Sequence, residues 1–295
     1  MILLSWYMDS SYPFLSVDYY SELADSRIFK PGDKISGKVI FIKTELLNMY
    51  IPKLLSLNSP FTLITACNDD MCVPYFTIPT TNMGTNDLHD SLLNHPLLIK
   101  WYTKNASIFH PKVIALPLGP KMQWRTTEFY GESKKDTLVL YKNNYLNPGV
   151  NLISNKPNLL YINMDINTTN NPFFKEHSNI RSKAINSLTT NGFISSKNKP
   201  LNEYISDLIN HKFCISPPGR GIDAHRTWEC LMAGTIPICI SSPLDYVYEN
   251  LPVLIVKDYS IITTAFLEEQ YSLFKNREYD YSILYGDYWK KVIRS

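Results

Sequence analysis

One segment constrains the fold more than any other, because it predicts a strand, a glycine loop, a helix and a second strand in unbroken order. Residues 213–240 read FCISPPGRGIDAHRTWECLMAGTIPICI. The apolar run from Phe213 ends at two prolines, which cannot donate to a sheet and so terminate a strand. Apolar residues at spacings of three and four then predict a helix from Asp223, with Asp223 as N-cap and Gly234 at the C-cap position. The apolar run 236–240 predicts the second strand.

The loop before this helix has the composition of a phosphate-binding site. Its two glycines are expected to adopt backbone conformations closed to other residues and to let the backbone approach a ligand closely. The amino terminus of the helix adds unpaired N–H groups and the positive end of the helix dipole. The residues expected to contact the ligand are Pro218, Gly219, Arg220, Gly221, Asp223, His225 and Arg226.

Arg226 and Glu229 are three residues apart, so they project from neighbouring turns of one helix face. A guanidinium group can bind a diphosphate through two parallel hydrogen bonds. A carboxylate beside it has a natural partner in the two hydroxyls of a ribose. The pair therefore predicts a nucleoside diphosphate as the ligand. The alternative interpretation is an ion pair on a solvated helix face.

The same residues resemble the donor-binding motif of exostosin-like glycosyltransferases. PPGRGIDAHRTWECLMAGTIPI, followed by LDYVYENLPVLIV, is similar to a P-x-G-x-G-x-D-x-H-R-x-W-E pattern that precedes a small-residue turn and a buried strand. The resemblance is more diffuse in the N-terminal half, where TLITACNDDMCVP and IKWYTKNASIFHPKVIALPLG are similar to strands of the acceptor domain in that family.

This resemblance implies a GT-B fold, in which two Rossmann-like domains with parallel sheets face each other across a cleft. It implies that the C-terminal domain holds a nucleoside diphosphate sugar, with UDP as the expected carrier. The N-terminal domain would bind a glycan or glycoprotein acceptor. Such enzymes are usually independent of metal, and exostosin-like ones are mostly inverting. Arg181 matches a position where the family has an arginine near the donor phosphates, and a charge on a solvated helix face is the alternative interpretation of this residue.

Acidic residues follow a predicted strand of the N-terminal half. Asn68, Asp69 and Asp70 come soon after the apolar run 61–66, at the end of a strand where open α/β sheets place ligands. Against the family pattern, Asp70 takes the aspartate position and Cys67 replaces a histidine, so Asp70 is the candidate general base. Like-charge repulsion from Asp69 would raise its proton affinity. An Asx-type turn is the alternative interpretation of the three residues.

Trp101 and Asn105 lie near the end of the next predicted strand and are expected to line the acceptor side, although Trp101 also suits a core position. A metal site at Asp69 and Asp70 is not expected. Consecutive residues at a strand end point to opposite sides, so both carboxylates cannot readily face one ion. We therefore predict no metal, and no cofactor beside the nucleotide sugar that serves as co-substrate.

The chain has 295 residues, enough for two domains of ordinary size. A turn-rich, charged stretch at 130–158 predicts the linker. This gives an acceptor-side domain over 1–145 and a nucleotide-sugar domain over 146–295. The resemblance to GT-B proteins implies that the last helix crosses back onto the first domain. Alternating strand and helix patterns favour parallel sheets. Further strands are expected at 38–43, 61–66, 97–102, 112–116, 159–163 and 253–256, and further helices at 45–55, 180–190, 201–210 and 261–274.

Charge and cysteine content limit the class of protein. A net charge of +2 without a basic stripe gives no reason to expect nucleic acid as a partner. No run of about eighteen apolar residues appears, so no membrane span is expected, although cellular exostosins are membrane-anchored. The five cysteines form no C-x-x-C pair and are expected to be reduced, mostly buried thiols of a cytoplasmic protein.

Two other classes stay open on the sequence alone. One is a catalytically inactive protein of the same fold that binds a nucleotide sugar, since a fold does not carry a function by itself. The other is a different α/β enzyme, such as a Rossmann oxidoreductase or a P-loop kinase. The chain has neither the G-x-x-x-x-G-K-[ST] motif of a P-loop kinase nor a G-x-G-x-x-G after its first strand, as a Rossmann oxidoreductase would. Neither of these two enzyme types explains Arg226 and Glu229 together.

Overall fold

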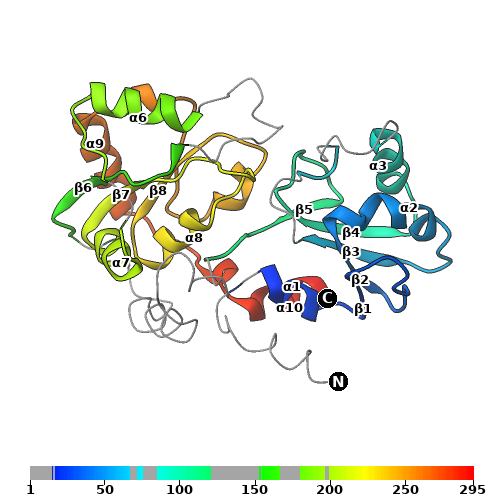
Figure 1. Ribbon diagram of the computed structural model, residues 1–295. Coiled ribbons are helices and arrows are strands. Elements are labelled where there is room, and N and C mark those ends of the chain that lie inside the picture. The colour runs from blue at the N-terminus through cyan, green and yellow to red at the C-terminus, as the bar shows by residue number, and fades with distance from the viewer. Residues whose placement is uncertain are drawn as a thin grey trace.

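The computed structural model describes residues 15, 17–66, 72–75, 85–120, 153, 155–166, 180–196 and 199–295. Over these residues the chain forms two parallel β-sheets flanked by helices (Figure 1), which confirms the α/β class. The first sheet has the order β1 (Ser26–Ile28), β2 (Val39–Lys43), β3 (Phe61–Ala66), β4 (Leu98–Lys104) and β5 (Val113–Leu116). The second has the order β6 (Asn158–Tyr161), β7 (His211–Ile215), β8 (Ile236–Ile240) and β9 (Leu254–Val256).

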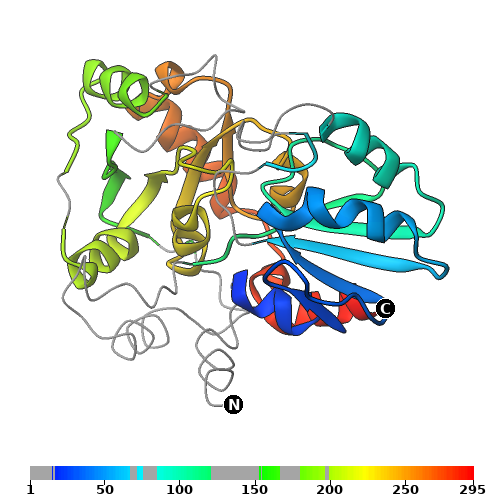
Figure 2. The same ribbon diagram turned by 45° about the vertical axis from the view of Figure 1, so that its right-hand side comes forward.

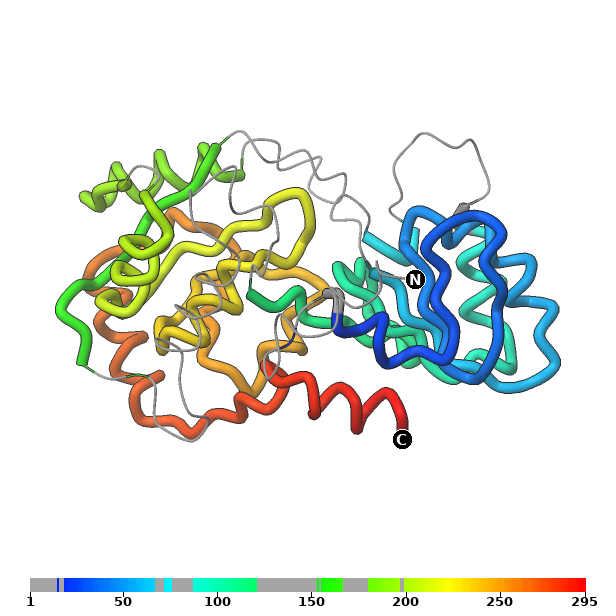
Figure 3. The backbone as a smooth tube through the Cα atoms, turned by 60° about the horizontal axis from the view of Figure 1, so that its bottom comes forward, coloured from blue at the N-terminus to red at the C-terminus, as the bar shows by residue number. Residues whose placement is uncertain are grey.

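The two halves of the chain lie side by side, with the blue-to-cyan part on one side of Figure 3 and the yellow-to-orange part on the other. Each expected strand is present to within a few residues, and β1 is an additional strand that the sequence did not predict. The predicted domain boundary at 145 falls outside the described residues. Within the described part of the chain, no helix combines the length and apolar character needed to cross a membrane.

Helices reach the two faces of the first sheet from different parts of the chain. Its strands lie in chain order, and every neighbouring pair is parallel. Right-handed crossovers in such a sheet place the connecting helices on one face, where α2 (Leu47–Leu55) and α3 (Thr85–Leu93) lie (Figure 1). The opposite face is covered by α1 (Val17–Glu22) and by α10 (Gly286–Arg294), which lie next to each other in Figure 2.

The last helix, α10, follows the second sheet in the chain but packs on the first. Its Trp289 and Ile293 belong to the same apolar cluster as Ile64 on β3. An ion pair of 2.6 Å between Arg294 Nη1 and Asp25 Oδ1 joins the end of this helix to the segment before β1. The C-terminus thus covers a sheet face that the crossover helices of that sheet leave open.

The helices of the second sheet follow the apolar periodicity of the sequence. They are α6 (Ile180–Thr190), α7 (Leu201–Asn210), α8 (His225–Met232) and α9 (Thr264–Lys275), with short 3-10 turns η4 (Asp245–Tyr248) and η5 (Tyr259–Ile261) between them. In α7, for example, the buried residues Leu201, Ile205 and Leu208 recur at helical spacing. After α8, Gly234 has φ 64° and donates to the Leu231 carbonyl, so the predicted glycine terminus of this helix is confirmed.

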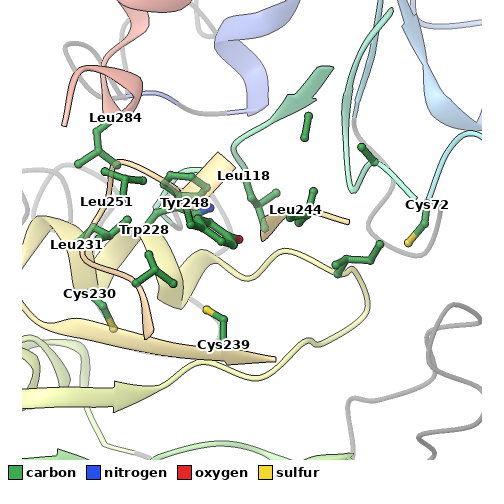
Figure 4. Packing of buried hydrophobic residues seen from close by; sticks show 14 of the residues in the cluster. Cys72, Leu118, Trp228, Cys230, Leu231, Cys239, Leu244, Tyr248, Leu251 and Leu284 are labelled. Carbon is green, nitrogen blue, oxygen red and sulfur yellow. The ribbon is translucent and has the colours of Figure 1, made fainter. Parts of the chain in front are cut away.

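One hydrophobic core continues from the first sheet into the second. Leu118, which follows β5, lies near Leu244, Tyr248 and Trp228 of the second half of the chain (Figure 4), and all four belong to a single buried cluster. This apolar contact fixes the edge of one sheet against the other. The described cysteines are free and buried, as predicted: Cys72, Cys214, Cys230 and Cys239.

Candidate anion-binding site

The candidate site lies at the carboxyl ends of the strands of the second sheet. Arg181, in the first turn of α6, donates from Nε to the Pro218 carbonyl over 2.9 Å and from Nη1 to the Asp165 carbonyl over 2.8 Å. Asp165 follows β6 and Pro218 follows β7, so this arginine joins the ends of two neighbouring strands. This edge is where open α/β sheets bind their ligands.

The two loop glycines serve close packing, because neither has a positive φ. The expectation that they adopt special backbone conformations was therefore wrong. A Cβ added to Gly219 would lie 2.9 Å from Nη2 of Arg181, and one added to Gly221 would lie 2.6 Å from Oδ1 of Asn105. The close approach that the sequence predicted does occur, but the approaching groups are side chains of this same chain.

Two arginines bring positive charge to this loop. Arg226, in the first turn of α8, has a buried Nε with no hydrogen-bond partner among the described residues. The pKa of Arg181 is lowered to about 10, first by burial and then by the positive charge of Arg226. A buried donor without an acceptor costs roughly 1–3 kcal/mol, and two nearby cations add repulsion. An anion bound beside both guanidinium groups would relieve both costs.

Tyr204 of α7 connects Arg226 to Glu229. The Arg226 guanidinium lies over the Tyr204 ring, with 5.7 Å from Cζ to the ring centroid, and the Tyr204 hydroxyl donates to Oε2 of Glu229 over 2.6 Å. Glu229 is only 5% exposed, so these residues do not form an ion pair on a solvated helix face. The carboxylate is instead held in a buried position within the same group of residues as Arg226.

Asp223 is bonded entirely within the protein. Its Oδ2 accepts from the Leu118 N–H over 2.8 Å and from Trp228 Nε1 over 2.7 Å, while its Oδ1 accepts from the Ala224 N–H and the Tyr248 hydroxyl. Burial raises its pKa to about 6, against the lowering effect of these hydrogen bonds. The N-cap of α8 is Ala224 and not Asp223 as predicted. This carboxylate therefore holds the start of α8 in place. Both of its oxygens already accept hydrogen bonds from the protein, so it is not a ligand contact.

The remaining loop residues differ in exposure. Pro218 is buried, whereas Arg220 is exposed at the tip of the loop. His225 is partly buried, and its Nδ1 donates to the Gly119 carbonyl over 2.8 Å, which assigns the proton to that nitrogen. Its ring is thus held by the segment that follows β5.

On the acceptor side, the structure describes only some of the predicted residues. The candidate base Asp70 and its neighbours Asn68 and Asp69 lie outside the described residues. Trp101 is fully buried and donates from Nε1 to Thr65 Oγ1 over 2.8 Å, so it belongs to the core and does not line a ligand site. Among the described residues, no group of three or more His, Cys, Asp or Glu side chains is placed to hold a metal ion.

Asn105, the other predicted acceptor-side residue, reaches the second sheet. Its Oδ1 accepts from the backbone N–H of Asp223 over 2.9 Å, and its amide fills the space beside Gly221. The sequence placed it near a ligand but gave no sign of this contact.

Sequence reasoning also missed two residues of the site. Tyr204 carries no motif, because its place in an amphipathic helix explains its presence. Tyr259 follows β9, lies close enough to Arg181 to influence its pKa, and has a buried hydroxyl without a partner among the described residues. The sequence gives no sign of its place in the site either, since an aromatic residue after a buried strand is common in a hydrophobic core.

No protein-family model matches the chain, and no curated protein matches it. The site combines a helix amino terminus, a close-packed loop and two arginines close enough for the charge of Arg226 to lower the pKa of Arg181.

Proposed function

We propose that the chain is a glycosyltransferase of GT-B architecture that moves a sugar from a nucleoside diphosphate, with UDP as the expected carrier, to a glycan or glycoprotein. One observation carries the proposal. Arg226 has a buried, unpartnered Nε beside Arg181, at the start of a helix whose dipole also favours an anion. Donors arranged in this way suit the diphosphate that leaves when a sugar is transferred.

The relation between the two sheets supports a two-substrate reaction. Asn105 and Leu118 follow β4 and β5 of the first sheet, and both bond to Asp223, which follows β7 of the second. The carboxyl ends of both sheets therefore meet at one loop. A donor bound at this loop would be within reach of an acceptor held by the first sheet.

The proposed reaction is a single displacement. The oxygen of an acceptor hydroxyl forms a bond to C1 of the sugar as the bond from C1 to the diphosphate oxygen breaks. The hydroxyl proton passes to a carboxylate, for which Asp70 remains our candidate. Arg181, Arg226 and the amino end of α8 neutralise the charge that develops on the leaving diphosphate, without requiring a metal.

A panel of nucleotides and nucleotide sugars tests this proposal. We expect nucleoside diphosphates to raise the melting temperature more than the corresponding monophosphates, since a ligand at about a hundred times its Kd stabilises by roughly 2.7 kcal/mol. Transfer from the best donor should survive excess chelator. Stabilisation without turnover over any acceptor would favour an inactive binding protein, and no response to any diphosphate would refute the proposed donor site.

A further inference from the structure

Asn105 combines an uncommon backbone conformation with a hydrogen bond that joins the two halves of the chain. It follows β4, is 1% exposed and has φ 53°, in the left-handed region that few residues other than glycine, asparagine and aspartate adopt. The side chain of this residue reaches the loop of the second sheet. There the side-chain Oδ1 accepts from the Asp223 N–H over 2.9 Å.

The loop of the second sheet is shaped to receive this side chain. A Cβ on Gly221 would collide with the Asn105 amide, whereas the backbone of Gly221 has no positive φ that would itself require glycine. Gly221 is therefore needed for the space that Asn105 occupies. The amide and the glycine form a matched pair across the two sheets.

Two further contacts from the first sheet hold the same loop. The Leu118 N–H donates to Oδ2 of Asp223 over 2.8 Å, and the Gly119 carbonyl accepts from Nδ1 of His225 over 2.8 Å. The segment after β5 is thus bonded to the chain at Asp223, where the loop ends, and at His225, just before Arg226. The conformation of the loop depends on a sheet to which the loop does not belong.

We propose that Asn105 is a positioning residue, which orders the loop 219–223 so that the loop and Arg226 bind an anion together. The identity of that anion as a diphosphate rests on the proposed function. The positioning role rests on the contacts alone. It follows that donor affinity depends on how the two sheets are docked, so the acceptor-side sheet controls donor binding without touching the donor.

The test replaces Asn105 with glycine, which accepts the positive φ and removes only the side chain. In Asn105→Gly we expect hydrogen exchange at the amides of residues 221–225 to become faster and the affinity for UDP to fall about tenfold, as the loss of a buried hydrogen bond predicts. A matched control is Tyr246→Phe. It removes another hydrogen bond between the halves of the chain, from the Ala115 N–H to the Tyr246 hydroxyl, without touching the loop.

A size exchange gives a second, independent measurement. Gly221→Ala alone should weaken UDP binding, because its methyl group collides with the Asn105 amide. Combined with Asn105→Gly, the same methyl group enters vacated space, so the double variant should bind more tightly than Gly221→Ala alone. If the two substitutions acted independently, the losses of UDP affinity that each causes would add in the double variant.

The outcomes separate the two proposals. Unchanged exchange at residues 221–225 in Asn105→Gly, or an equal loss of affinity in Tyr246→Phe, would overturn the positioning role. A wild-type protein that binds no nucleoside diphosphate would overturn the proposed function. In that case the exchange measurement, made without ligand, would still decide whether Asn105 orders the loop.

Discussion

A cationic side chain lies at each end of α8, and the two differ in their hydrogen-bond partners. At the carboxyl end, the buried Lys156 donates from Nζ to the Ala233 carbonyl and to Thr235 Oγ1, each over 2.8 Å. At the amino end, Arg226 has a buried Nε with no partner among the described residues. A helix dipole favours a cation at its carboxyl end and an anion at its amino end. The dipole of α8, taken alone, therefore favours the charge of Lys156 and disfavours that of Arg226, and the two cations also differ in how completely their donors are satisfied.

This difference indicates what each residue is for. The acceptors of Lys156 are built into the chain, so its role is complete in the folded protein. For Arg226, one donor, Nε, has no acceptor among the described residues, and its positive charge lowers the pKa of Arg181. A bound anion would supply the acceptor that Arg226 Nε lacks and would reduce the repulsion between the two arginines. The contrast predicts that the two ends of α8 respond to substitution to different extents.

The largest expected effect is on stability. Lys156→Met should lower the free energy of unfolding by about 2–3 kcal/mol, because the Ala233 carbonyl loses its donor in a buried position. The matched Arg226→Met should lower it by less than about 1 kcal/mol, because it removes a buried Nε without a described partner and the repulsion from Arg181, which offset the lost contact with the Tyr204 ring. Urea unfolding at neutral pH measures both. Equal losses in the two variants would remove the contrast between the ends of α8.

The next effect is on ligand affinity. Arg226→Lys keeps the charge but loses the planar fork, so UDP binding should weaken about tenfold to thirtyfold. Binding of UMP should weaken less, because a monophosphate lacks the distal phosphate that the fork addresses. Calorimetry with both nucleotides decides this. An equal loss for UMP and UDP would show that Arg226 does not contact the distal phosphate.

Stability should also depend on pH through Lys156. Burial lowers its pKa from 10.5 to about 8 in the folded protein. Between these values the unfolded chain binds more protons than the folded one, so the contribution of Lys156 to stability rises with pH. The rise should be about 1 kcal/mol from pH 8 to about pH 9, and it should be absent in Lys156→Met. A wild-type curve parallel to that of the variant would show that the lysine keeps its ordinary pKa.

Much of the fold could be predicted from the sequence, because it depends on local patterns. The strands and the helices around them follow from the periodicity of apolar residues. The role of Gly234 follows from its position directly after a helical pattern. The packing of α10 on the first sheet was expected only through a family resemblance. Its physical reason is the sequential strand order, which leaves one sheet face without crossover helices.

The site was predicted less completely, because its contacts join distant parts of the chain. Asp223 reads as a helix cap, yet it bonds to Leu118, which lies 105 residues earlier. Lys156 and Tyr204 carry no local signal, since a lysine near a strand and a tyrosine in an amphipathic helix are ordinary. The residue types at the loop were recognised, but the partners that decide their roles come from tertiary structure.

The smallest effect concerns the link between Arg226 and Glu229. Tyr204→Phe keeps the ring beneath Arg226 but removes the hydroxyl that donates to Oε2 of Glu229 over 2.6 Å. If Glu229 accepts from the ribose, the carboxylate loses one of the contacts that orient it, and UDP affinity should fall about threefold, the size of one modest hydrogen bond. Inorganic pyrophosphate has no ribose, so its affinity should stay at the wild-type value. A parallel loss for pyrophosphate would place the role of Tyr204 at Arg226, and unchanged affinity for both would leave Glu229 as a buried structural carboxylate that recognises no part of the nucleotide.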